Sequence, residues 1–163
     1  MRPGVISSLI LLLGTWCAST TARAEVRDYE LVISETPVNF SGTQRSALTV
    51  NGVLPATTLE FTEGDTARIR VVNKLKVESS IHWHGILLPN REDGVSYLTT
   101  PPILPGMTHS FNFPIIQNGT YWYHSHTMLQ EQQGVYGAIV IHPKAGSKSA
   151  EREYAVVLSD WTD

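Results

Sequence analysis

The sequence predicts an all-β fold in which two sheets pack face to face as a sandwich. Short runs rich in β-branched and aromatic residues recur along the chain, and no stretch keeps a helical period. Turn-forming pairs such as Asn51-Gly52 and Asn118-Gly119 separate these runs. Many short strands with turns at this spacing are typical of a β-sandwich.

The first 24 residues have the composition of a secretory signal. Arg2 gives a positive start, residues 5–13 are mostly apolar, and Ala22-Arg23-Ala24 matches the small-x-small pattern that signal peptidase cleaves. The apolar run is too short to span a bilayer. We therefore expect cleavage after Ala24, a periplasmic or secreted protein, and no membrane association after cleavage.

The charge and the cysteine content exclude several classes of function. The formal net charge is −3, and loss of Arg2 and Arg23 with the signal makes it −5, so the chain has no basic footprint for nucleic acid. The one cysteine, Cys17, lies in the signal. The mature chain therefore has no disulfide, no zinc-thiolate site and no blue-copper site of its own, since that site needs a cysteine sulfur.

The predicted strands follow one another from the signal to the last residues. They cover residues 28–33, 65–75, 80–85, 108–113, 119–126, 134–142 and 153–161. In the second run Ala67, Ile69 and Val71 alternate with arginines, which predicts one buried face.

Residues 143–149 have the composition of a linker, so the last predicted strand belongs to a following unit. We expect a signal peptide over 1–24, a first domain over 25–145, and over 146–163 a linker with the first strand of a truncated second domain. On this interpretation the chain is a fragment.

Two His-x-His pairs stand out among the six histidines. They are His82 with His84 and His124 with His126, whereas random placement predicts about 0.2 such pairs. On a strand, residues i and i+2 point to the same face, so each pair projects together. If the two strands are neighbours, four imidazoles converge, and imidazole is a good ligand for copper, zinc, iron and nickel.

The two remaining histidines, His109 and His142, each stand alone, and we expect them to be surface or core residues. The aromatic residues Trp83, Tyr121, Trp122 and Tyr123 are expected to pack the core around the ligands.

Two further groups near the histidine pairs have structural rather than chemical interpretations. Gly134 and Gly137 are expected to allow turning or close packing. The polar stretch 130–132 is expected to be a solvated loop, with ordering of water near the metals as the alternative.

These motifs, taken in order, resemble the multicopper oxidases, the laccase-like family. The likeness covers residues 25–163 and is greatest to the periplasmic copper-resistance protein A type. The matching segments are 82–85, 93–95, 105–106, 117–126, 130–137 and 157–163. The resemblance implies a Greek-key β-sandwich of the cupredoxin-like class and an oxidoreductase that uses copper, with a role in copper resistance.

The resemblance also implies a role for each paired histidine. His82 would bind the type 2 copper, His84 and His124 one type 3 copper, and His126 the other. Asp93 resembles an acidic residue near the copper cluster, and reduction of O₂ to water needs a proton supply, so Asp93 is a candidate relay. Asp-Gly is also a common turn pair, which is the alternative explanation.

The implied partners are O₂ and a reducing substrate such as a phenol or cuprous ion. The other four ligands and the type 1 copper would come from C-terminal cupredoxin domains outside this chain. Two other interpretations use the same histidines: a non-catalytic copper-binding or sequestration module, and a cupin-like metalloenzyme. The second His-x-His pair and the lack of a well-spaced glutamate argue against the cupin-like enzyme.

Overall fold

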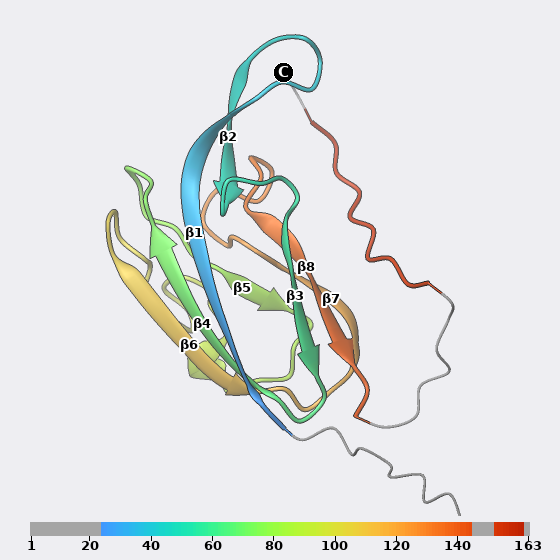
Figure 1. Cartoon of the computed structure of the whole chain (residues 1–163). Helices are drawn as coiled ribbons and strands as arrows, with labels where there is room; N and C mark the ends of the chain where they lie inside the picture. Colours follow the sequence, from blue (N-terminus) through green and yellow to red (C-terminus); the bar gives the residue numbers. More distant parts are fainter. Residues whose placement is uncertain (1–23, 145–151, 162–163) are drawn as a thin grey trace, which may run out of the picture.

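A computed structural model describes residues 24–144 and 152–161 of the chain (Figure 1). Residues 1–23 of the expected signal and residues 145–149 of the expected linker lie outside these ranges. The described part contains eight strands, one short 3-10 helix, η1 (Asn90–Glu92), and no α-helix. The all-β prediction is confirmed. No helix in the described ranges is long and apolar enough to cross a membrane.

The strands form two sheets of four. The first sheet has the order β2 (Arg45–Val50), β1 (Val26–Val38), β4 (Thr66–Asn73) and β6 (Thr108–Pro114). Pairing is parallel between β1 and β4 and antiparallel elsewhere in this sheet. Figure 1 shows β1 as the longest strand, running beside both β2 and β4.

The second sheet has the order β3 (Ala56–Thr62), β8 (Tyr136–His142), β7 (Gly119–His124) and β5 (His82–His84). Here β3 and β8 are parallel, and β8 with β7 and β7 with β5 are antiparallel. Three of the four paired histidines, His82, His84 and His124, therefore lie on adjacent strands at one side of this sheet, and His126 follows the end of β7 by two residues.

The core fills the space between the sheets and follows the period-two pattern of the strands. Ala67, Ile69 and Val71 of β4 are buried as predicted, and the arginines between them are exposed. Trp83 of β5 is fully buried, with its ring edge-on to Phe111 of β6 at 5.1 Å between ring centroids. Aromatic packing thus joins the sheet that carries the histidines to the opposite sheet.

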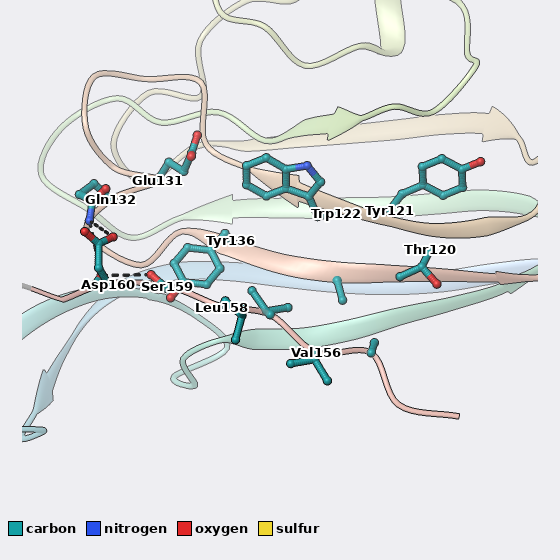
Figure 2. A pocket seen from close by; sticks show the side chains of 13 residues that line it. Thr120, Tyr121, Trp122, Glu131, Gln132, Tyr136, Val156, Leu158, Ser159 and Asp160 are labelled. Atoms are coloured by element: carbon teal, nitrogen blue, oxygen red, sulfur yellow. Dashed lines mark hydrogen bonds between the residues drawn. The ribbon is translucent and has the colours of Figure 1, made fainter. Parts of the chain in front are cut away.

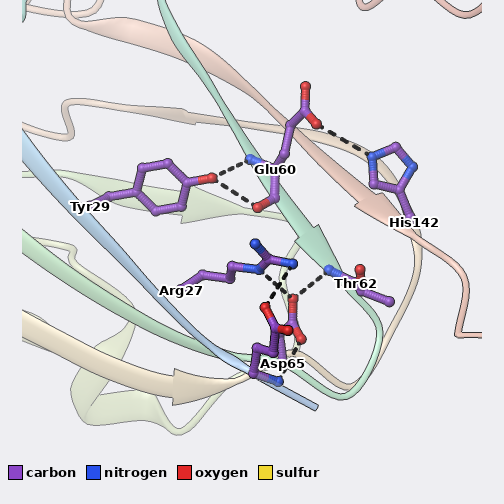
Figure 3. A network of polar contacts seen from close by, with 7 residues as sticks. Arg27, Tyr29, Glu60, Thr62, Asp65 and His142 are labelled. Atoms are coloured by element: carbon purple, nitrogen blue, oxygen red, sulfur yellow. Dashed lines mark hydrogen bonds and ion pairs between the residues drawn. The ribbon is translucent and has the colours of Figure 1, made fainter. Parts of the chain in front are cut away.

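A buried carboxylate fixes the turn between β3 and β4 to the start of β1 (Figure 3). The side chain of Asp65 is 1% exposed and accepts hydrogen bonds from the backbone amides of Thr62 at 2.7 Å and Glu25 at 2.9 Å. Arg27 Nε lies 3.3 Å from the same carboxylate. Burial alone would raise the pKa of Asp65, but these donors outweigh it and hold the pKa below its usual range.

The structure differs from the sequence prediction at three segments. Strands β2 and β3 were not predicted; both are edge strands rich in polar residues. The strand predicted over 153–161 is absent, because residues 152–161 form no backbone ladder with any described strand. They run as an extended segment alongside the second sheet (Figure 1).

Candidate metal centre

The register of β5 on β7 brings the two histidine pairs together. His82 is directly opposite His124, and His84 is opposite Trp122. Opposed residues of an antiparallel pair project from the same face, as do residues two apart on one strand. His82, His84 and His124 therefore share one face, and Trp83 between the first two points into the core.

The four imidazole rings form a single cluster. The ring centroid of His82 lies 5.6 Å from that of His84, 5.5 Å from that of His124 and 5.3 Å from that of His126. His124 lies 5.4 Å from His84 and 5.5 Å from His126 by the same measure. The convergence that the sequence predicts is present.

Three of the rings direct nitrogen atoms at one another. One ring nitrogen from each of His82, His84 and His124 lies within 4.8 Å of the other two. The closest approach is 3.2 Å, between His84 Nδ1 and His124 Nε2. A set of closely spaced imidazole nitrogens without thiolates suits copper, zinc, iron or nickel.

Hydrogen bonds on the far side of two rings set their orientation. Nδ1 of His82 lies 2.8 Å from the backbone oxygen of Asp93, and Nδ1 of His124 lies 3.0 Å from the backbone oxygen of Ser125. A carbonyl oxygen only accepts, so each Nδ1 carries the proton and donates. Nε2 of both rings is then left with the lone pair that a metal requires.

The protonation state of His124 also favours metal binding. Burial lowers the pKa of His124, and the neighbouring His82 and His126 rings act in the same direction, against the raising effects of Ser125 and Glu131. The net shift of this pKa is downward, which favours the neutral ring, the form that binds a cation.

Trp122 contradicts the expectation that all four nearby aromatics pack the core. Trp83 and Tyr123 are fully buried, but Trp122 is half-buried on the outer face. Its ring stacks on His124 at 4.1 Å and on His84 at 5.0 Å between ring centroids. The reason is parity: Trp122 is two residues from His124 and so shares its face.

Tyr123 supports the cluster from the core side. Its hydroxyl donates to the backbone oxygen of Thr57 at 2.8 Å, and burial raises the pKa of Tyr123. Gly137 lies opposite it on β8, and a Cβ there would be 2.6 Å from the Tyr123 ring. The glycine therefore provides room for the aromatic ring, as the close-packing expectation requires.

Asp93 lies beside the cluster. Its Oδ1 is 3.5 Å from His82 Nδ1, its Oδ2 accepts a hydrogen bond from Thr99 Oγ1 at 3.4 Å, and its side chain is 26% exposed. The following residue, Gly94, has φ +86°, and a Cβ there would lie 1.8 Å from the backbone oxygen of Ile81. The Asp-Gly pair is thus a tight turn packed on β5, and the same turn places a carboxylate next to His82.

The stretch 130–132 is the expected solvated loop only in part, because Gln132 is exposed whereas Gln130 is buried. Gln130 is 3% exposed; its Oε1 accepts from Ser79 Oγ at 2.6 Å and from Ser125 Oγ at 2.9 Å. Glu131 Oε2 lies 2.7 Å from His124 Nδ1. The loop folds back onto the end of β7. Gln130 and Glu131, which are polar, therefore contact Ser125 and His124.

A groove adjoins this loop on the outer face of the second sheet (Figure 2). It has a volume of ≈ 450 Å³ and lies between β7, β8 and the segment 155–160. Trp122 and Glu131 line it, and Gln132 Nε2 is 3.4 Å from Asp160 Oδ1 across it.

The two lone histidines lie elsewhere. His109 is on β6 of the opposite sheet, packed on Phe111 at 4.5 Å between ring centroids. His142 ends β8 and pairs with Glu60 at 3.6 Å (Figure 3). Neither belongs to the cluster of paired histidines, as the sequence predicts.

Comparison with known proteins shows the same family throughout. Residues 32–146 match the multicopper oxidase family. Copper resistance protein A of Escherichia coli is 52% identical over 83% of this chain and 22% of its own length. Copper resistance protein A of Pseudomonas syringae pv. tomato is 46% identical over 91% of this chain and 25% of its own length. This chain thus spans about a quarter of these relatives.

Solved structures agree with the sequence relatives. A multi-copper oxidase from Pseudomonas thermotolerans superposes with a TM-score of 0.74 at 33% identity, over 77% of this chain and 32% of that one. A laccase from Botrytis aclada gives 0.69 at 39% identity, over 76% of this chain and 23% of that one. The sandwich is therefore of the cupredoxin-like class, and copper is the metal that the family implies for the histidine cluster. The chain belongs to the multicopper oxidase family.

Proposed function

We propose that this chain is the first domain of a multicopper oxidase and supplies half the histidine ligands of a trinuclear copper site. In this proposal His82 binds the type 2 copper, His84 and His124 bind one type 3 copper, and His126 binds the other. The observation that carries it is the cluster of four rings on β5, on β7 and just after β7, in which five of the ring pairs have centroids 5.3–5.6 Å apart.

The donor set fits copper. All four groups are imidazoles, and the Nδ1 hydrogen bonds of His82 and His124 leave Nε2 free to bind metal. When bound, copper supplies the redox chemistry that reduces O₂ to water with electrons from a reducing substrate, a phenol or cuprous ion. The protein's own part is to hold the ligands on rigid strands and to supply protons.

The half-site also explains what the chain lacks. After residue 24 the sequence has no cysteine, so a type 1 copper and the other four histidine ligands come from C-terminal cupredoxin domains in this proposal. The curated relatives are about four times as long as this chain, which leaves room for such domains. We further propose a signal peptide over 1–24 with cleavage after Ala24, and a periplasmic or secreted location with a role in copper resistance.

Asp93 is the proposed proton relay. Its carboxylate lies 3.5 Å from His82 Nδ1 and remains 26% exposed, so it reaches both the site and solvent. Replacement by Asn keeps the shape but removes the carboxyl group that can take up and release a proton. We expect Asp93→Asn to slow O₂ consumption by the full-length oxidase and to leave its copper content unchanged.

The test of the half-site uses the chain from Glu25 to Asp163, which contains every described strand and the whole core. We expect it to bind copper, to lose binding in His124→Ala but not in His142→Ala, and to consume no O₂ with a phenol or cuprous ion. In this proposal, a product that continues into C-terminal domains with a His-Cys-His motif should turn over. Robust turnover by this chain alone would contradict the half-site. Copper binding without turnover in the longer product would instead indicate a sequestration module.

A further inference from the structure

We propose that Glu131 is a positioning residue for the metal-binding face of His124. This inference rests on the proposed copper site and adds a residue that the paired motifs do not include. Glu131 Oε2 lies 2.7 Å from His124 Nδ1, which is shorter than the 3.5 Å between Asp93 Oδ1 and His82 Nδ1. The distance is that of a charge-assisted hydrogen bond in which the imidazole N–H donates to the carboxylate.

This contact acts on the ligand atom at the other side of the ring. A proton held on Nδ1 fixes the tautomer with a lone pair on Nε2, and a carboxylate acceptor raises the basicity of that nitrogen. In His124 that nitrogen is the one 3.2 Å from His84 Nδ1. The Glu131 contact therefore orients the ring toward the centre of the cluster.

The surrounding loop holds Glu131 in place from both sides. On one side Gln130 is buried, and its Nε2 donates to the backbone oxygen of Glu78 at 2.7 Å. On the other side Gln132 Nε2 is within 3.4 Å of Asp160 Oδ1, as Figure 2 shows. The Glu131 carboxylate itself is 47% exposed, so the contacts of its two neighbours, and not burial, hold it in place.

The Ser125 backbone oxygen, 3.0 Å from the same Nδ1, cannot replace this role completely. Residue 125 adjoins His124 in sequence, so its carbonyl moves with the ring when β7 shifts. Glu131 comes from a loop that Gln130 also ties to the backbone oxygen of Glu78, so it restrains the ring relative to a second segment of the chain. Two acceptors from different segments fix the plane of the ring better than one does.

The experiment compares Glu131→Ala, Glu131→Gln and the matched control Glu60→Ala in the chain from Glu25 to Asp163. Glu60 also pairs with a histidine on this sheet, His142 at 3.6 Å, but outside the cluster. Cu(II) affinity is measured by competition with a chromophoric chelator. We expect Glu131→Ala to weaken binding about 10–100-fold, Glu131→Gln to recover most of the loss because its amide oxygen still accepts, and Glu60→Ala to bind as the unaltered chain does.

A second measurement needs no metal. Long-range ¹H–¹⁵N spectra of the copper-free chain report the tautomer of each histidine, and we expect the His124 signals to change in Glu131→Ala but not in Glu60→Ala. Unchanged His124 signals, unchanged copper affinity in Glu131→Ala, or no recovery in Glu131→Gln would each overturn the proposal. If the unaltered chain binds no copper, the half-site proposal fails, and the metal-free spectra still decide the role of Glu131.

Discussion

Replacement of Asp65 by Asn should destabilise the fold strongly and in a pH-dependent way. The carboxylate is 1% exposed and receives three donors, the Thr62 amide at 2.7 Å, the Glu25 main-chain nitrogen at 2.9 Å and Arg27 Nε at 3.3 Å. Asn keeps one oxygen, but its NH₂ group must face at least one of these donors. Hydrogen bonds to charged groups contribute about 1.5–3 kcal/mol each, so we expect a loss of about 2–4 kcal/mol at pH 7.

The pH dependence follows from the direction of the pKa shift. The folded pKa of Asp65 lies below its value in the unfolded chain, about 3.9. The carboxylate therefore stabilises the fold fully above that unfolded value, and this stabilisation is lost as the pH falls through the folded pKa. The gap in unfolding free energy between the unaltered chain and Asp65→Asn should be constant from pH 7 to about 5 and shrink below about 4.

Urea unfolding monitored by tryptophan fluorescence, from pH 7 to pH 2.5, measures this gap. Asp28→Asn is the control, because the Asp28 carboxylate is 60% exposed and pairs with Arg68 on the surface. We expect that control to stay close to the unaltered chain. A loss of less than about 0.5 kcal/mol in Asp65→Asn at pH 7, the usual size for a neutral surface change, would refute the reasoning. So would a gap that does not change with pH.

Three other substitutions test features near the histidine cluster. Gly137→Ala should lower the free energy of unfolding by about 1–3 kcal/mol, because its Cβ would overlap the ring of Tyr123. Urea unfolding should show a smaller decrease when the same change is made in Tyr123→Leu. An equal decrease would contradict the packing argument. Gly94→Ala should weaken copper binding, because a Cβ 1.8 Å from the Ile81 oxygen displaces the turn beside His82; unchanged affinity in a chelator competition would contradict this. Gln130→Ala should lower the unfolding free energy by about 1–3 kcal/mol, since buried donors lose their acceptor; thermal unfolding equal to that of Gln132→Ala would contradict it.

The histidine cluster could be predicted from the sequence because strand geometry is local. The alternation of His82, Trp83 and His84 fixes which side chains share a face, whatever surrounds the strand. That β5 pairs with β7, some 40 residues away, is not a local property, and only the resemblance to a family indicated it. The stacking of Trp122 on the rings follows the same parity rule and could have been predicted with it.

The role of the 130–132 loop could not be predicted in this way. Gln130 and Glu131 belong to a run of four polar residues that ends at Gly134, which is the usual composition of a solvated loop. Their positions depend on Ser79, 51 residues earlier in the chain, and on the fold of the loop back onto β7. Strand β3 was also missed, although its buried residues Leu59 and Phe61 carry the period-two signal.

The imidazoles project from the outer face of the sandwich, while the residues between them, such as Trp83, belong to the core. Folding energy and metal affinity are therefore supplied by different sets of atoms on the same strand. The packing of the core includes none of the paired histidines, so we expect the chain from Glu25 to Asp163 to fold without the metal. For the protein engineer, the ligand set can be exchanged without redesign of the interior that supports it.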